Sequence, residues 1–113
     1  GPFDYPAQAR LWVPRRMPAP HEAAHPAAVG TLAARVAHRL GGRTFVLTTT
    51  LRVLPQIADA ARAWLERQLG TVEVLVQGSE PRRTLLQRFG DGQQRMLVGS
   101  HSFWEGIDMP GDA

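Results

Sequence analysis

The chain has 113 residues, which is enough for one domain with a buried core. No apolar run approaches the ~20 residues that a membrane-spanning helix needs, and the absence of cysteine excludes disulfides and thiolate metal sites and fits a reducing compartment. We therefore expect a soluble, cytoplasmic protein. The net charge is +3 and every one of the 13 basic residues is arginine, which favours phosphate-bearing partners only modestly.

Residues 1–26 are rich in proline, which is poorly tolerated inside helices and central strands. We expect an extended lead-in over 1–26, with one possible short strand at Arg10–Val13. The remainder, 27–113, has the pattern of a folded domain.

From residue 27 onward, segments of helical and of strand character alternate. Apolar residues at helical spacing predict helices over about 27–40, 53–69 and 79–89. Short β-branched apolar runs predict buried strands over 44–48, 71–77 and 95–100. Such alternation implies crossover connections and a parallel sheet, so the predicted fold class is α/β, with helices flanking the sheet in three αβα layers. Three strands are few for such a sheet, so either the lead-in adds strands or the chain is a truncated part of a longer protein; we favour truncation.

A polar or glycine-bearing cluster follows each predicted strand. The clusters are Thr48–Thr50, Gln77–Ser79 and Ser100–Gly111. Because parallel strands end at one edge of the sheet, where such folds bind ligands, we expect a shared binding edge. The alternative is that these polar residues only cap turns and helices, as they do in many loops.

The last cluster carries a resemblance to a known family. "SFWEGIDMPG" (102–111) resembles motif V of the DinG/XPD-type DNA helicases of superfamily two, position by position. "GRTFVLTTT" (42–50) is similar to the family's motif IV strand, and "VLVQG" (74–78) to its strand before a Gln-Gly step. "LLQRF", "PFDY" and "MPAP" also resemble family segments in the same order, so the resemblance covers nearly the whole chain.

The resemblance implies part of the second RecA-like motor domain of an ATP-dependent DNA helicase. In that family ATP binds between two motor domains of one chain, and single-stranded DNA runs across both. Carried onto this sequence, motif V implies nucleotide contacts from Glu105, Gly106 and Asp108. The implied nucleic-acid contacts are Thr48, Thr49, Thr50, Gln77, Gly78, Ser100, His101 and Ser102. The resemblance also implies a 5′-to-3′ direction and a role in DNA repair or replication.

Several parts of the ATPase machinery are missing from these residues. There is no G-x-x-x-x-G-K-[ST] phosphate loop and no D-E-x-H-type motif for Mg²⁺. The family's iron–sulfur cluster needs cysteines in the first motor domain, and none occurs here. Phosphoryl transfer needs the phosphate-binding loop, the metal ion and an arginine finger together. We therefore expect no ATPase or unwinding activity from this chain alone.

Other interpretations stay open at this point. The chain fits a stand-alone nucleotide- or phosphate-binding α/β module, although the missing glycine-rich loop counts against it. It also fits an interaction domain without motor activity. Phe103 and Trp104 are candidates for stacking on a DNA base, but we favour packing for Trp104. Asp108 is a candidate turn cap as well as a nucleotide ligand.

Overall fold

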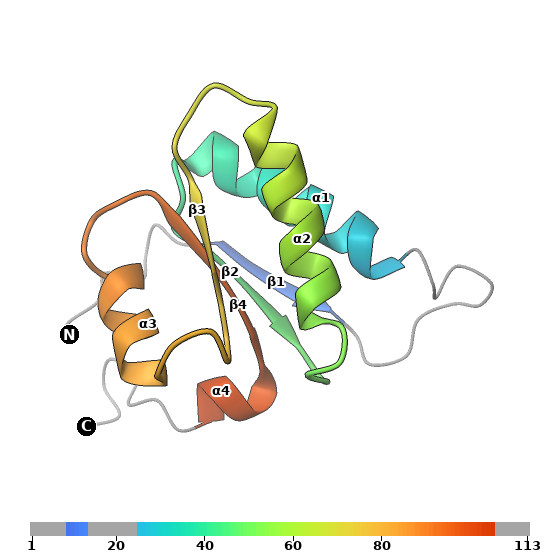
Figure 1. Cartoon of the computed structure of the whole chain (residues 1–113), viewed down its shortest axis with the longest axis vertical. Helices are drawn as coiled ribbons and strands as arrows, with labels where there is room; N and C mark the ends of the chain where they lie inside the picture. Colours follow the sequence, from blue (N-terminus) through green and yellow to red (C-terminus); the bar gives the residue numbers. More distant parts are fainter. Residues whose placement is uncertain (1–8, 14–24, 106–113) are drawn as a thin grey trace.

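The structure is a computed structural model, and it describes residues 9–13 and 25–105. The fold is α/β, as predicted (Figure 1). Strands and helices alternate along the chain in the order β1 (Ala9–Val13), α1 (His25–Leu40), β2 (Thr44–Thr48), α2 (Leu54–Glu66), β3 (Glu73–Val76), α3 (Arg82–Phe89), β4 (Arg95–Ser100) and α4 (His101–Glu105). No helix within these described ranges is long and apolar enough to span a membrane.

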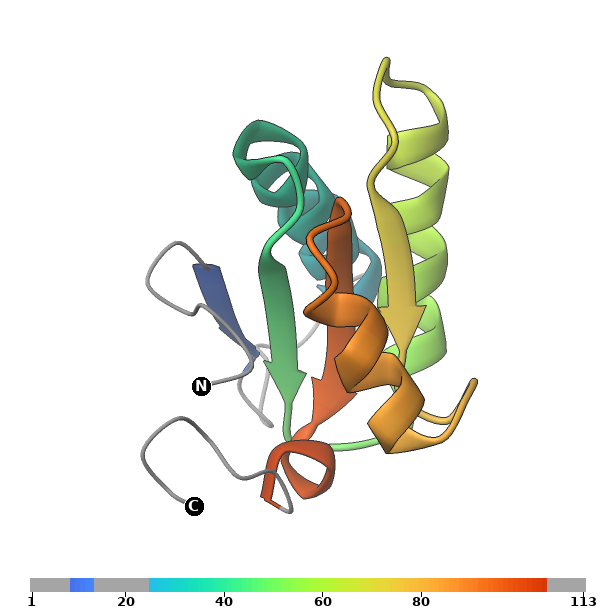
Figure 2. The same ribbon diagram turned by 90° about the vertical axis from the view of Figure 1, so that its left-hand side faces the viewer.

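The four strands form one parallel sheet in the order β1-β2-β4-β3. The lead-in therefore supplies a strand, β1, at one edge, while β3 forms the other edge (Figure 2). The central pair is β2 and β4, joined in a register that sets Thr44 opposite Met96 and Thr48 opposite Ser100. All four strands thus end on the same side of the molecule.

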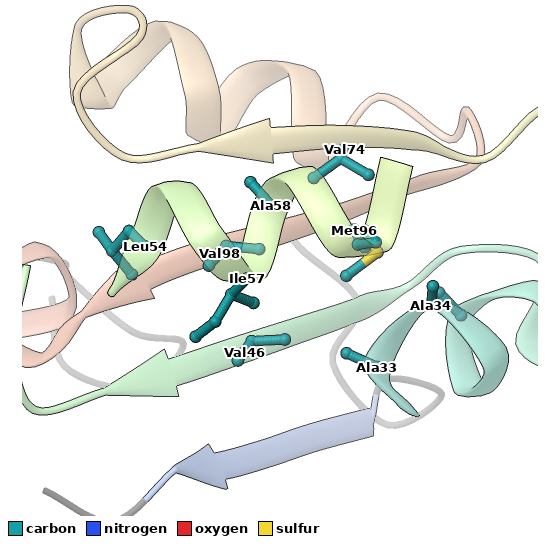
Figure 3. Close-up of a cluster of buried hydrophobic side chains, with 11 residues drawn as sticks. Ala33, Ala34, Val46, Leu54, Ile57, Ala58, Val74, Met96 and Val98 are labelled. Carbon is teal, nitrogen blue, oxygen red and sulfur yellow. The ribbon is translucent and has the colours of Figure 1, made fainter. Parts of the chain in front are cut away.

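Helices cover both faces of the sheet, which gives the three layers that the alternation predicted. Helices α1 and α2 lie side by side on one face, whereas α3 and α4 lie on the other (Figures 1 and 2). Successive side chains of a strand point to opposite faces, so each buried strand must be apolar on both sides. The face under α1 and α2 is filled by small and aliphatic side chains: Ala33, Ala34, Ala37, Val46, Leu54, Ile57, Ala58, Ala61, Val74, Met96 and Val98 (Figure 3). The opposite face is filled by Phe45, Leu75, Leu85, Phe89, Leu97 and Phe103.

The element boundaries differ from the expected ones at a few ends, for local reasons. Helix α3 begins at Arg82 rather than near Ser79, because the Ser79 hydroxyl and backbone N–H both donate to the Val76 carbonyl, at 2.7 and 3.1 Å, and close a turn. Helix α1 ends at the glycine pair as expected. Gly41 and Gly42 adopt φ values of +70° and +95°, which glycine tolerates, and the Gly42 N–H donates to the Ala37 carbonyl at 2.7 Å.

Candidate functional site

The described parts of the predicted polar clusters, 48–50, 77–79 and 100–105, lie at a common edge of the sheet. Strand β2 ends at Thr48, β4 at Ser100 and β3 at Val76, and all three run in parallel. We call the segments at these strand ends, 48–53, 77–81 and 100–105, the rim. The expectation that three strands deliver their trailing residues to one edge is confirmed.

A topological switch point lies at the centre of the rim. The chain leaving β2 enters α2 on one face of the sheet, and the chain leaving β4 enters α4 on the other face. In open α/β sheets, ligands bind where neighbouring strands diverge in this way, beyond the carboxyl ends of the strands. The topology therefore selects the gap between the Thr48 and Ser100 ends as the place for a ligand.

On the β2 side, three consecutive threonines take different positions. Thr48 is buried, with 1% of its surface exposed, and its hydroxyl donates to the Thr50 carbonyl at 2.7 Å, which shapes the loop. Thr49 is exposed to solvent. The hydroxyl oxygen of Thr50 is buried and has no hydrogen-bond partner in the described part of the chain. Thr49 is thus the residue of this group whose side chain is open to a ligand, and Thr48 holds the turn.

On the β4 side, Gln77 joins the ends of two strands. Its backbone N–H donates to the Val98 carbonyl at 2.9 Å, and its side-chain oxygen accepts the backbone N–H of Ser100 at 2.7 Å. The hydroxyl oxygens of Ser100 and Ser102 lie 2.7 Å apart, and the Gln77 side-chain nitrogen approaches Ser102 Oγ at 3.5 Å. Next to Gln77, Gly78 has a φ of +96° and open space around the position of a Cβ. The result is a small hydroxyl and amide cluster with Ser102 exposed.

The residues after β4 form a short helix, α4, which was not among the helices expected from the sequence. In α4, His101 and Glu105 are exposed and their side chains approach at 3.7 Å. Phe103 is buried at 3% exposure, and the Arg82 guanidinium donates to its carbonyl at 3.4 Å. The rings of Trp104 and Phe45 meet edge-on, with their centroids 4.4 Å apart. Helix formation is favoured because it turns both aromatic rings onto the sheet face, where they bury their area.

Packing is therefore the role that the structure shows for both aromatic residues. The indole nitrogen of Trp104 is buried and has no hydrogen-bond partner among residues 9–13 and 25–105. Of the predicted nucleotide ligands, Glu105 is placed at the end of α4, on the rim. Gly106 and Asp108 lie outside the described residues, so their role stays a prediction.

The rim does not form a metal site by itself. No group of three His, Asp or Glu side chains able to hold a metal ion occurs in the described segments. Glu105 is one carboxylate of the rim, while Glu80 is engaged by Arg88. A Mg²⁺ ion that accompanies ATP prefers carboxylates together with phosphate oxygens. The described residues do not fit such an ion.

The opposite end of the sheet carries an ion-pair network that no sequence pattern predicts. Arg95 contacts Glu73 at 2.8 Å and also Asp91, and Arg88 contacts Glu73 and Glu80. The hydrogen bond from Arg95 lowers the pKa of the Glu73 carboxyl and, together with the Gln93 backbone N–H, that of Asp91. The same contacts raise the pKa of Arg95, so the network stays charged at neutral pH. It joins the starts of β3 and β4, and through the Arg88–Glu80 pair it also reaches the rim segment 77–81.

The doubly wound parallel sheet, with hydroxyl, amide and glycine residues at its switch point, places the chain among the three-layer α/β domains and is consistent with a truncated RecA-like domain. Within that class, the chain belongs to the helicase C-terminal domain family, whose model matches residues 33–113. No solved structure matches it.

Curated relatives are similar to nearly the whole chain. It is 33% identical to the ATP-dependent DNA helicase YoaA of Escherichia coli (strain K12) over 111 residues, which is 98% of this chain and 17% of that protein. It is 32% identical to the ATP-dependent helicase DinG of Mycobacterium tuberculosis (strain ATCC 25618 / H37Rv), over 97% of this chain and 16% of that protein. The probable ATP-dependent helicase YpvA of Bacillus subtilis (strain 168) is 32% identical over 66% of the chain and 11% of that protein. The chain thus spans about one sixth of the length of the first two relatives.

Proposed function

We propose that the chain is part of the second motor domain of an ATP-dependent DNA helicase that acts in the cytoplasm. The observation that carries this proposal is the convergence of the Thr48–Thr50 and Ser100–Ser102 segments at the switch point of the sheet, in a chain of the helicase C-terminal family. In the longer protein, this rim faces the first motor domain of the same chain and a single DNA strand. ATP binding closes the two domains, and hydrolysis reopens them and moves the strand 5′ to 3′ during DNA repair or replication.

The rim residues divide into those that contact DNA and those that hold the contacts in place. Thr49, His101 and Ser102 are exposed and supply donors to phosphate oxygens, the usual targets of such groups. Gly78 leaves room for the backbone of the strand to approach. The second group keeps the loops in shape through the bonds described above and consists of Thr48, Thr50, Gln77 and Ser100.

The nucleotide end of the rim begins at α4. Glu105, Gly106 and Asp108 contact the bound ATP or its water network. The phosphate loop and the Mg²⁺ ligands come from the first motor domain, as does the iron–sulfur cluster where the longer protein has one, and the arginine finger comes from a later motif of the family. On this proposal, the chain alone does not hydrolyse ATP.

The DNA part of the proposal is tested by binding of a labelled single-stranded oligothymidine, followed by fluorescence anisotropy. Replacing Thr49 or Ser102 by Ala removes one hydroxyl each, and we expect affinity to fall roughly three- to tenfold per hydroxyl, as for one hydrogen bond. Thr71→Ala is the matched control, because Thr71 is an exposed threonine at the opposite end of the sheet. Equal losses in the rim and control variants would refute the assignment.

The nucleotide part is tested in the longer protein. Asp108→Ala and Glu105→Gln should each lower DNA-stimulated ATP turnover while the melting temperature stays unchanged. Unchanged turnover in either variant removes that residue from the site.

A further inference from the structure

The charge distribution along the chain has one unbalanced region. From His25 to Ala58 there is no aspartate or glutamate, whereas the same stretch contains four arginines, Arg35, Arg39, Arg43 and Arg52. Elsewhere the acidic and basic residues are interspersed. Helix α1, which lies in this region, therefore carries only positive formal charge.

Two of these arginines share the solvent-facing side of α1. The helix buries Pro26, Gly30, Ala33, Ala34 and Ala37. The opposite side presents Ala28, Leu32, Arg35 and Arg39, all exposed and spaced at three or four residues. We call this set the outer face of α1. Leu32 has 54% of its surface exposed.

Within the described part of the chain, neither of these two arginines has an acidic partner. Among the described residues, Arg35 and Arg39 take part in no ion pair, whereas Arg62, Arg88 and Arg95 each contact a carboxylate. Like charges four residues apart on a helix repel and destabilise it. The neighbouring helix α2 is balanced, because its exposed side carries Asp59 and Glu66 as well as Arg62.

We propose that the outer face of α1 is a second binding site for the phosphate backbone of a nucleic-acid strand, separate from the rim. Arg35 and Arg39 are one helical turn apart, about 6 Å along the axis, and each guanidinium presents a fork of donors that matches phosphate oxygens. Leu32 adds an apolar contact for a base or sugar. Helix α2, whose carboxylates and arginines balance, offers a polyanion no comparable positive face.

The position of this face separates it from the proposed helicase site. Helix α1 ends at Leu40, just before β2 begins, so Arg39 lies toward the starts of the strands and the rim lies at their ends (Figure 1). A DNA strand bound at both places would run along the outer face of α1 as well as across the rim. The site therefore goes beyond the proposed function and does not use its residues.

The test measures binding of the 113-residue chain to a labelled oligothymidine at 50 and 200 mM salt. Loss of two phosphate contacts in the double variant Arg35→Gln/Arg39→Gln should reduce the slope of log affinity against log salt by about 1.4. The ratio of wild-type to variant affinity should then be about sevenfold larger at 50 mM than at 200 mM salt. Arg35→Lys/Arg39→Lys keeps the charge and should keep the slope.

The control is Arg67→Gln, which removes one exposed arginine from the end of the adjacent helix α2 and should leave the slope unchanged. Circular dichroism confirms that each variant is folded. The proposal is overturned if the double variant binds like Arg67→Gln, or if the wild-type chain binds no DNA. It is also overturned if labelled polyglutamate binds to this face while DNA binding is unaffected, since the surface then serves an acidic protein segment.

Discussion

Replacing Gly30 by Ala tests whether helices α1 and α2 approach each other as closely as they do in the structure. A Cβ atom at position 30 would lie 2.2 Å from the Ile57 carbonyl oxygen and 3.0 Å from the Ala60 Cβ. Ordinary contacts of a Cβ atom begin beyond 3 Å, so the two helices must separate by about 1 Å. The obstacle is backbone, which cannot rotate away as a flexible side chain does.

Two opposing terms set the size of the effect. Alanine favours a helix interior by about 1 kcal/mol relative to glycine. Overpacking in a well-filled core costs about 1–3 kcal/mol, and separation of α1 from α2 adds to that cost by loosening the contacts of Ala33, Ala37 and Ile57. We expect the overpacking cost to exceed the gain in helix propensity, with a net loss of about 1–2 kcal/mol in the free energy of unfolding.

The measurement is thermal unfolding followed by circular dichroism. For a domain of this size, about 1–2 kcal/mol corresponds to a fall of roughly 4–10 °C in the melting temperature. Ala28→Gly is the companion variant, because it changes propensity alone at an exposed position of the same helix. If Gly30→Ala melts at or above the wild-type temperature, the close approach of the two helices is wrong.

Three further predictions concern the rim and the ion pairs. Phe103→Ala should lower the free energy of unfolding by about 3–5 kcal/mol in urea titrations, since the ring is buried, and an unchanged midpoint would contradict the packing of α4. Gln77→Ala leaves the Ser100 N–H without its acceptor and should cost about 1–3 kcal/mol, whereas Gln77→Glu keeps an acceptor and should lose less in the same melts. The pKa of Glu73 is lower in the folded chain than in the unfolded one, so its stabilising effect is present at neutral pH and is lost as pH falls below the ordinary carboxylate range. Arg95→Gln should flatten that pH dependence of the melting temperature, and an identical pH profile would show that the pair does not contribute.

The fold was predictable because its strands carry strong local patterns. The runs at 44–48 and 95–100 are apolar on both faces, which only a sheet covered on both sides accommodates, and both became central strands with the predicted bounds. The strand predicted over 71–77 was too long, because strand β3 contains only Glu73–Val76, the residues that pair with β4. Thr71 lies outside the residue pairs of that ladder, and Gln77 follows the last pair and adds only its N–H bond to the Val98 carbonyl.

The rim was predictable as a location but not as a set of contacts. Parallel topology alone requires Thr48 and Ser100 to lie at one edge, since both end parallel strands. The bond from Ser100 to Gln77 joins residues 23 positions apart, and it depends on β3 lying beside β4, which no local pattern encodes. Helix α4 was missed for a related reason. Its sequence is short and flanked by glycines, and its conformation depends on burial of Phe103 against the sheet face that α3 also covers.

The arrangement of α4 bears on how nucleotide and DNA contacts are connected. Trp104 meets Phe45 edge-on at 4.4 Å and Phe103 at 5.2 Å, so the aromatic side of α4 rests on β2 although α4 follows β4. Phe45 is three residues before Thr48, on the strand that leads to the threonine loop. A displacement of the α4 backbone would therefore disturb the Trp104–Phe45 contact. Because closely packed interiors transmit strain, this aromatic contact links the proposed nucleotide end of the rim to its proposed DNA end through the sheet, without requiring a direct contact between the two groups of ligands.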